Sequence, residues 1–195
     1  MINKLILFTF FLLISSTLAS YGWFGYCSIK NKIHTLQKLN VNELMGNWYE
    51  QFRDHDSFSY NSQLSQCNTV TYSLNEDSSV NVSHREYFIN YRYATEYSGV
   101  FKCTEKDDDV GKCKINYGEW FGSLPYWSMA TDYKSYLFIY ECKEYYGLFF
   151  SENIWVYTRE KIAGYTMGEI LDVIFPTYLL KKTIQGVGCE YKNDN

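Results

Sequence analysis

The stretch Gly46-Asn47-Trp48-Tyr49-Glu50 decides how the rest of this sequence is interpreted. It opens a predicted strand over residues 47–53, in which Trp48, Glu50 and Phe52 share one face at the two-residue period of β-structure. A glycine and a tryptophan two residues apart are common in proteins. The pattern therefore indicates a particular fold only together with segments further along the chain.

Beyond this stretch, seven further alternating runs predict strands, and then the period changes. The predicted strands span residues 66–74, 80–87, 95–103, 112–117, 126–131, 135–142 and 153–160. Eight short strands separated by polar turns indicate an all-β barrel or sandwich. Residues 166–169 then have the form of a helix-capping box, and apolar residues at helical spacing follow until Pro176 ends the helix. The tail over residues 179–195 is predicted to be extended.

The first residues and the overall charge bear on where the protein acts. Residues 1–19 have one lysine, a short apolar run and small residues near Ala19, which is typical of a cleaved secretory signal peptide. A membrane anchor is the alternative, but the apolar run is short and no basic cluster follows it. Residues 20–195 would then form one secreted, extracellular domain. The net charge of −4 argues against nucleic acid and anionic membranes as main partners.

Six cysteines behind a signal peptide predict three disulfides. Cys103 and Cys113 flank a charged turn between two predicted strands, so a disulfide across this hairpin is the simplest assignment. Zinc is the competing interpretation, but there is no CxxC pair and the histidines are not grouped with the cysteines. The acidic run at residues 105–109 lacks the glycine and terminal glutamate of an EF-hand calcium loop. We therefore expect no metal and no cofactor.

No catalytic signature is found, because the sequence has neither a triad pattern nor a glycine-rich phosphate loop. We therefore expect the protein not to be an enzyme. The sequon at Asn81 predicts an N-linked glycan on the face of its strand that points away from the barrel interior.

Three downstream segments combine with Gly46 and Trp48 into a recognisable set. They span residues 124–133, 139–142 and 154–159, and the second and third contain Cys142 and Arg159. Together they resemble the signatures of the lipocalins, most closely the apolipoprotein D and insect bilin-binding branch. The resemblance implies an eight-stranded antiparallel up-and-down barrel with one C-terminal α-helix packed outside. It also implies that Gly46, Trp48 and Arg159 close the bottom of the barrel, with the guanidinium lying over the indole.

The resemblance further implies a ligand pocket and two more disulfides. Positions matching Trp127, Trp155, Tyr72 and Tyr117 line the pocket in that branch, and all four are aromatic here. His84 replaces an amide-bearing residue that faces the ligand, and a role for His84 as a haem ligand is a remote alternative. The disulfides implied by the branch are Cys27–Cys142 and Cys67–Cys189.

Three functions are compatible with these predictions. The leading one is a secreted carrier that binds a small hydrophobic ligand such as a fatty acid, sterol, retinoid or bilin in the barrel cavity. The second is an enzyme or antioxidant protein on the same barrel, which would need a free reactive cysteine. The third is a scaffold that binds another protein or a receptor. The fold alone does not decide among the three.

Overall fold

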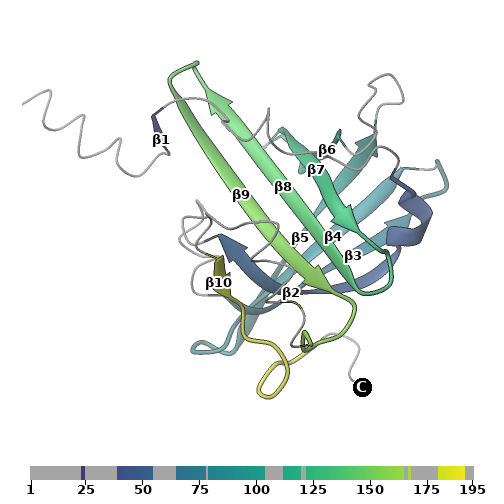
Figure 1. The fold of residues 1–195 in the computed structure, drawn as a ribbon, viewed down its shortest axis with the longest axis vertical. Helices are drawn as coiled ribbons and strands as arrows, with labels where there is room; N and C mark the ends of the chain where they lie inside the picture. The colour runs from purple at the N-terminus through teal and green to yellow at the C-terminus, as the bar shows by residue number, and fades with distance from the viewer. Residues whose placement is uncertain are drawn as a thin grey trace, which may run out of the picture.

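A computed structural model shows a closed antiparallel β-barrel, as predicted (Figure 1). It describes residues 23–24, 39–54, 65–77, 79–103, 112–119, 122–164, 167 and 180–191. The barrel strands are β2 (Gly46–Asp54), β3 (Gln66–Leu74), β4 (Val80–Phe88), β5 (Tyr93–Cys103), β6 (Lys112–Asn116), β7 (Ser123–Thr131), β8 (Tyr136–Tyr145) and β9 (Phe149–Thr158). Each strand pairs with the next, and β9 pairs with β2 to close the barrel. A closed barrel leaves none of its eight strands as a free edge.

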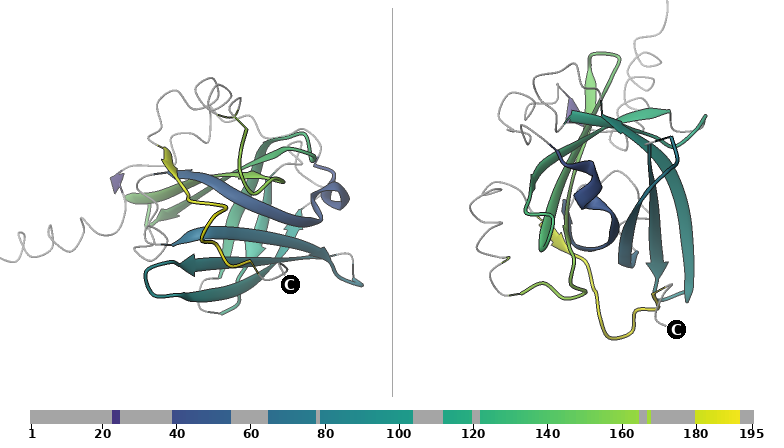
Figure 2. Two further views of the ribbon diagram at one scale, coloured as in Figure 1. Left: turned by 90° about the horizontal axis from the view of Figure 1, so that it is seen from below. Right: turned by 90° about the vertical axis from the view of Figure 1, so that its right-hand side faces the viewer.

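Three short elements accompany the barrel. Strand β1 (Trp23–Phe24) pairs with β9, and β10 (Leu180–Lys182) pairs with β2, which agrees with the predicted extended tail. The 3-10 helix η2 (Val41–Leu44) precedes β2 and lies across one end of the barrel in the right-hand view of Figure 2. The predicted C-terminal helix lies outside the described residues, apart from Met167. The predicted signal peptide, residues 1–19, also lies outside them.

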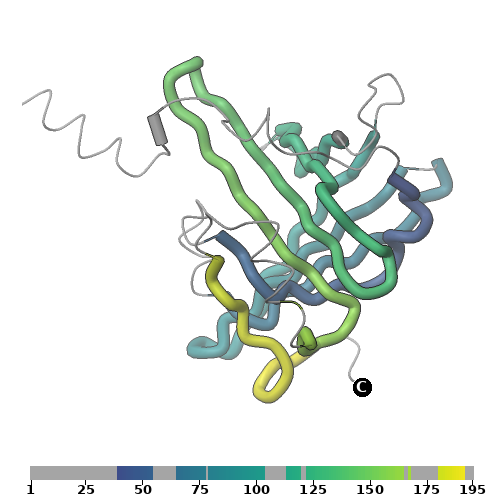
Figure 3. The backbone as a smooth tube through the Cα atoms, in the orientation of Figure 1, coloured from purple at the N-terminus to yellow at the C-terminus, as the bar shows by residue number. Residues whose placement is uncertain are grey.

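The hairpin of β8 and β9 is longer than the sequence predicts. Its strands continue to Tyr145 and restart at Phe149, so only three residues form the turn. Tyr146 and Gly147 make this tight turn with positive φ angles of 55° and 64°. The tube trace in Figure 3 shows this hairpin reaching beyond the neighbouring strands.

Alternation along the strands separates two apolar clusters. In β8, Leu137 and Ile139 belong to one cluster, whereas Phe138 and Tyr140 belong to the other. The first cluster also contains Trp48 from β2 and at least one side chain from each of the remaining barrel strands, so it fills the barrel interior. The second lies on the outer face of β8 and β9, where the buried side chain of Met167 joins it.

The interior is sealed at one end by the predicted pair, Trp48 and Arg159. The guanidinium carbon of Arg159 lies 3.8 Å from the ring centre of Trp48, and Trp48 is fully buried. The indole nitrogen donates to the carbonyl of Leu44 at 2.8 Å, which fastens η2 to the barrel. Arg159 donates to the carbonyls of Asn47 and Glu43, both at 3.0 Å. This contact therefore joins η2, β2 and the end of β9 at the closed end.

Gly46 allows this arrangement because it leaves space beside Arg159. Its φ angle of +96° lies in the left-handed region that favours glycine. A Cβ atom at this position would lie 3.3 Å from an Arg159 guanidinium nitrogen. A side chain there would add backbone strain and crowd the guanidinium that covers Trp48.

Two predicted disulfides are present in the described residues. Cys103 and Cys113 face each other directly in the register of β5 and β6. Cys67 on β3 is bonded to Cys189, which lies 122 residues further along the chain. Cys142 is also disulfide-bonded, and its predicted partner, Cys27, lies outside the described residues.

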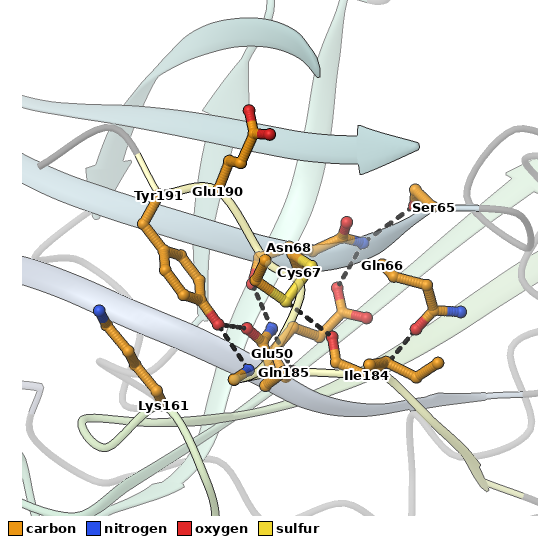
Figure 4. Close-up of a disulfide and its surroundings, with 12 residues drawn as sticks. Glu50, Ser65, Gln66, Cys67, Asn68, Lys161, Ile184, Gln185, Glu190 and Tyr191 are labelled. Carbon is orange, nitrogen blue, oxygen red and sulfur yellow. Dashed lines mark hydrogen bonds between the residues drawn. A yellow bond between two sulfur atoms is a disulfide. The ribbon is translucent and has the colours of Figure 1, made fainter. Parts of the chain in front are cut away.

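The Cys67–Cys189 disulfide anchors a C-terminal segment in the barrel wall (Figure 4). This segment continues the ladder beyond β10, because its residues 183 and 184 bond to the backbones of Gln51 and Cys67 respectively, both at 2.8 Å. The amide of Gln185 donates to the carbonyls of Glu50 and Asn68. The segment therefore fills the gap where β2 and β3 diverge.

Candidate ligand-binding site

The inward-facing side chains form a packed layer next to the closed end. Tyr72 and Tyr126 are both buried, and their hydroxyls lie 2.5 Å apart. Both rings meet Phe101 edge-on, with centroids 6.5 and 5.5 Å away. Burial raises the pKa of both hydroxyls above the usual value, so both remain protonated at neutral pH. Tyr72, a predicted pocket residue, thus lies in the floor of the interior.

Above this floor, three rings from β4, β5 and the end of β6 form an aromatic cluster. Tyr97 stacks on His84 with centroids 5.0 Å apart and planes 8° from parallel. The Tyr117 hydroxyl lies 3.0 Å from Nε2 of His84, and its ring centre lies 5.7 Å from that of Tyr97. Gly99 gives Tyr117 the space to lie there, because a Cβ at Gly99 would be only 2.8 Å from the Tyr117 ring. We call His84, Tyr97 and Tyr117 the aromatic cluster.

His84 is neutral in this setting. It is only 9% exposed, and burial lowers its pKa to about 4. The contact with the Tyr117 hydroxyl occupies Nε2, one of the two ring nitrogens. His84 therefore acts as a neutral hydrogen-bonding group facing the interior.

Tyr97 is the accessible member of the cluster. It is 44% exposed although it lies on the inward face of β5, where Gly99 and Phe101 continue the same alternation. The surrounding barrel nevertheless raises the pKa of its hydroxyl well above the usual value by desolvation. Tyr97 is thus partly accessible, in contrast to the buried floor residues.

Acidic side chains also face the interior. Glu50 and Arg53 form a buried ion pair at 2.6 Å, and Thr183 donates to the same carboxylate. Glu86 lies beside the aromatic cluster and accepts a hydrogen bond from the Tyr97 hydroxyl at 3.4 Å. Glu141 follows Ile139 on the inward face of β8. Its carboxyl has neither a hydrogen bond nor a salt bridge to any residue that the structure describes.

Burial shifts both of these carboxyls toward their uncharged forms. Desolvation raises the pKa of Glu86, and the nearby Arg53 opposes the shift. Desolvation raises the pKa of Glu141 from 4.5 to about 7, and Lys143 opposes it. At neutral pH, Glu141 is therefore close to the midpoint of its titration.

We expect Glu141→Gln to stabilise the protein at pH 8 but not at pH 4. In the wild type, the raised pKa means that the folded protein binds the proton of Glu141 more tightly than the unfolded chain does. The free energy of unfolding therefore falls as the pH rises from about 4.5 through 7. At pH 8 the buried charge lowers the free energy of unfolding by on the order of 2–3 kcal/mol, and solvent screening of the carboxylate makes this cost smaller. Urea unfolding of both proteins at the two pH values measures this. An equal stability difference at pH 4 and pH 8 would contradict the expected burial of the charge.

The two predicted pocket tryptophans lie on opposite faces of the barrel wall. Trp155 packs against the interior cluster and is half-buried. Trp127 instead packs against the outer cluster, where its ring centre lies 5.7 Å from that of Tyr140. The placement of Trp127 in the interior is therefore corrected, and Tyr126 takes the inward position. Trp127 lies directly opposite Tyr140 in the register of β7 and β8, and Tyr140 faces outward, so the two side chains share the outer face.

Sequence reasoning misses further interior residues besides Tyr126. Tyr97, Glu86 and Glu141 are absent from the predicted pocket although they lie in predicted strands. Glu86 shares its face with His84 by simple alternation, and this signal was sufficient to find it. Tyr97 and Glu141 can be placed in the interior only when the inward faces of β5 and β8 are known.

No group of three or more His, Cys, Asp or Glu side chains in the part of the chain that the structure describes could hold a metal ion. None of the helices within the described residues has the length and apolar character needed to cross a membrane.

Comparison with known proteins identifies relatives in sequence. The model of the lipocalin / cytosolic fatty-acid binding protein family matches residues 45–174. Apolipoprotein D of Bos taurus is 28% identical over 123 residues, which cover 63% of this chain and 62% of that protein. Apolipoprotein D of Cavia porcellus is 27% identical over 126 residues, covering 64% and 63%. The matches thus span less than two thirds of these relatives.

Solved structures share the fold at lower identity. Insecticyanin from the tobacco hornworm Manduca sexta superposes with a TM-score of 0.67 at 17% identity, covering 87% of this chain and 92% of that one. Lobster apocrustacyanin A1 gives a TM-score of 0.66 at 20% identity, covering 87% and 93%. At these identities the likeness concerns the fold alone.

Proposed function

Because the chain belongs to the lipocalin / cytosolic fatty-acid binding protein family, we propose that it binds and carries a small hydrophobic molecule inside its barrel. One observation carries the proposal. The inward face is tightly packed near Trp48 and Arg159, whereas further along it presents accessible aromatic surface at Tyr97 and Trp155. Such a face offers apolar contact area together with a few polar groups, which is the usual character of a small-molecule site.

The energetics of apolar burial support useful affinity. Removing about 300–400 Å2 of apolar surface from water contributes roughly 8–10 kcal/mol at about 25 cal/mol per Å2. A dissociation constant near 1 μM corresponds to a binding free energy of about 8 kcal/mol. Apolar burial alone therefore reaches this affinity only if the entropic and desolvation costs of binding are small. A rigid closed barrel limits that loss, because its wall needs little ordering.

Secretion and glycosylation belong to the same proposal. Residues 1–19 would be removed as a signal peptide, and residues 20–195 would act outside the cell. Asn81 lies between the inward-facing Val80 and Val82, so its own side chain is on the outer face of β4. A glycan at Asn81 would therefore leave the interior free. The disulfides are also suited to an oxidising compartment.

A ligand panel tests the proposal. The mature, delipidated protein is titrated with a fatty acid, a sterol, retinol and biliverdin, and its tryptophan fluorescence is followed. We expect saturable quenching with one site per chain by at least one member, in the micromolar range or tighter. Absence of saturable binding across the whole panel, with the fold intact by far-UV circular dichroism, would overturn the proposed carrier function and favour a protein-binding scaffold.

A further inference from the structure

We propose that the ligand carries a protonated amine, which binds between Glu86 and Glu141 beside the exposed ring of Tyr97. This inference rests on the proposed function, because it assigns the polar end of the hydrophobic ligand. It narrows the ligand class to apolar molecules with a basic nitrogen. Three features of the interior support it: uncompensated acidic groups, an accessible aromatic ring and a neutral histidine.

The acidic groups of the interior are unequally compensated. Glu50 has Arg53 as its ion-pair partner at 2.6 Å and receives a hydrogen bond from Thr183. By contrast, neither Glu86 nor Glu141 forms a salt bridge within the described part of the chain. Among the described residues, the two carboxyls therefore have no ion-pair partner, and the charges of Arg53 and Lys143 act on them only from beyond ion-pair distance. A cationic ligand group would supply the missing charge.

Among the described residues, the nearby basic side chains are neutral, paired elsewhere or beyond ion-pair distance of these carboxyls. The ammonium of Lys143, on the same strand as Glu141, lies 5.2 Å from the centre of the Tyr145 ring. Arg53 is paired with Glu50, and His84 is uncharged because burial lowers its pKa. Within the part of the chain that the structure describes, a ligand cation would thus meet no protein cation at ion-pair distance from either carboxyl.

Tyr97 offers the aromatic surface that a cation prefers. One face of its ring stacks on His84, with an interplanar angle of 8°, and the side chain remains 44% exposed. An ammonium group over an aromatic face gains about 0.5–2 kcal/mol, more when water is excluded. The Tyr97 hydroxyl already contacts Glu86 at 3.4 Å, so ring and carboxylate lie at one place.

Glu141 faces the same interior as Glu86, because both side chains lie on the inward faces of their strands, with Val82 on β4 and Ile139 on β8. Burial is the main cause of the raised pKa of the Tyr97 and Tyr117 hydroxyls, and the charges of Glu86 on β4 and Glu141 on β8 both add to it. A bound cation would favour the ionised form of each carboxyl and lower its pKa. A ligand carboxylate would meet two acidic groups and would be repelled. The interior therefore discriminates among ligands by charge.

The affinity for an amine should depend on pH. An alkylamine stays protonated from pH 5.5 to 8, whereas Glu141 gains a proton as the pH falls through about 7. Amine binding should therefore weaken on acidification.

Several other titratable or charged groups of the described residues face the interior around Glu86 and Glu141. They are Glu50 and Arg53 from β2, His84 from β4, Tyr97 from β5, Tyr117 after β6, Lys143 from β8 and Tyr157 from β9.

A matched probe series tests the inference by titration calorimetry. The probes are 4-phenylbutylamine, 4-phenylbutan-1-ol and 4-phenylbutyrate, which share one apolar body and differ in charge. We expect the amine to bind at least tenfold more tightly than the alcohol at pH 8, and the acid most weakly. At pH 5.5 the advantage of the amine over the alcohol should shrink at least threefold.

Charge-removing variants locate the amine. Glu86→Gln and Glu141→Gln should each weaken amine binding at least fivefold and leave alcohol binding within twofold. The matched control is Glu96→Gln, which removes the same charge from the outer face of β5, where Glu96 lies 3.6 Å from Arg85. This control should leave the affinity for both probes unchanged.

The outcomes separate this inference from the proposed function. If the alcohol binds as tightly as the amine, or if the acid binds most tightly, the amine assignment is wrong while the carrier function stands. Equal losses for amine and alcohol in the two glutamine variants would show a structural effect and also overturn the assignment. If no probe and no member of the ligand panel binds, the carrier function itself fails.

Discussion

Replacing Trp48 with alanine is expected to lower the free energy of unfolding by about 3–5 kcal/mol. This is the cost of deleting a fully buried aromatic side chain and leaving a cavity. The substitution also removes the surface on which Arg159 lies, at 3.8 Å, and the hydrogen bond that fastens η2 through Leu44. Urea denaturation followed by far-UV circular dichroism measures the change.

The matched control for this experiment is Leu74→Ala at the end of β3. Leu74 is 52% exposed, so its truncation should change the stability by no more than about 0.5 kcal/mol. A loss below 1 kcal/mol for Trp48→Ala would contradict the view that this end of the barrel is sealed and tightly packed.

Removing the Cys67–Cys189 disulfide by replacing both cysteines with alanine should cost about 4–5 kcal/mol. The bond closes a loop across 122 residues of sequence, and loop-closure entropy grows with loop length. Removing Cys103–Cys113, which closes a separation of 10 residues, should cost about 2–3 kcal/mol in the same model. The ranking is measured by urea unfolding of the two double variants against the wild type.

The first of these double variants should also loosen the C-terminal segment. Thr183 and Gln185 bond to Glu50 and its neighbours only while that segment stays in the wall. Amide hydrogen exchange near Gln51 and Cys67 should therefore become faster. Equal losses of stability in the two variants, with unchanged exchange, would mean that the disulfide does not hold the segment in place.

The sequence predicts the wall of this barrel well because strand alternation and turn chemistry are local. The predicted first residues of β3 and β4, Gln66 and Val80, agree with the structure. The contact of Arg159 with Trp48 is implied by the family resemblance and is present. The Cys103–Cys113 pairing also needed only a hairpin, because residues that flank one turn end up opposite each other.

The interior was predicted less well because its composition depends on register. Alternation alone does not say which face of β7 points inward, and only the pairing of Trp127 with the outward-facing Tyr140 shows that Trp127 lies outside and Tyr126 inside. The inward position of Glu141 is visible only once the inward face of β8 is known, because its neighbour Tyr140 points outward. The insertion of the C-terminal segment beside β2 is a contact between distant parts of the chain, which no local pattern encodes.

The placement of Trp155 and Trp127 on opposite faces gives the most direct test of ligand binding inside the barrel. The dissociation constant of the tightest panel ligand is measured by calorimetry for the wild type, Trp155→Ala and Trp127→Ala, with folding checked by far-UV circular dichroism. We predict that Trp155→Ala weakens binding at least tenfold and that Trp127→Ala leaves it within twofold. Unchanged affinity in Trp155→Ala together with a loss in Trp127→Ala would place the ligand outside the barrel and contradict ligand binding in the interior.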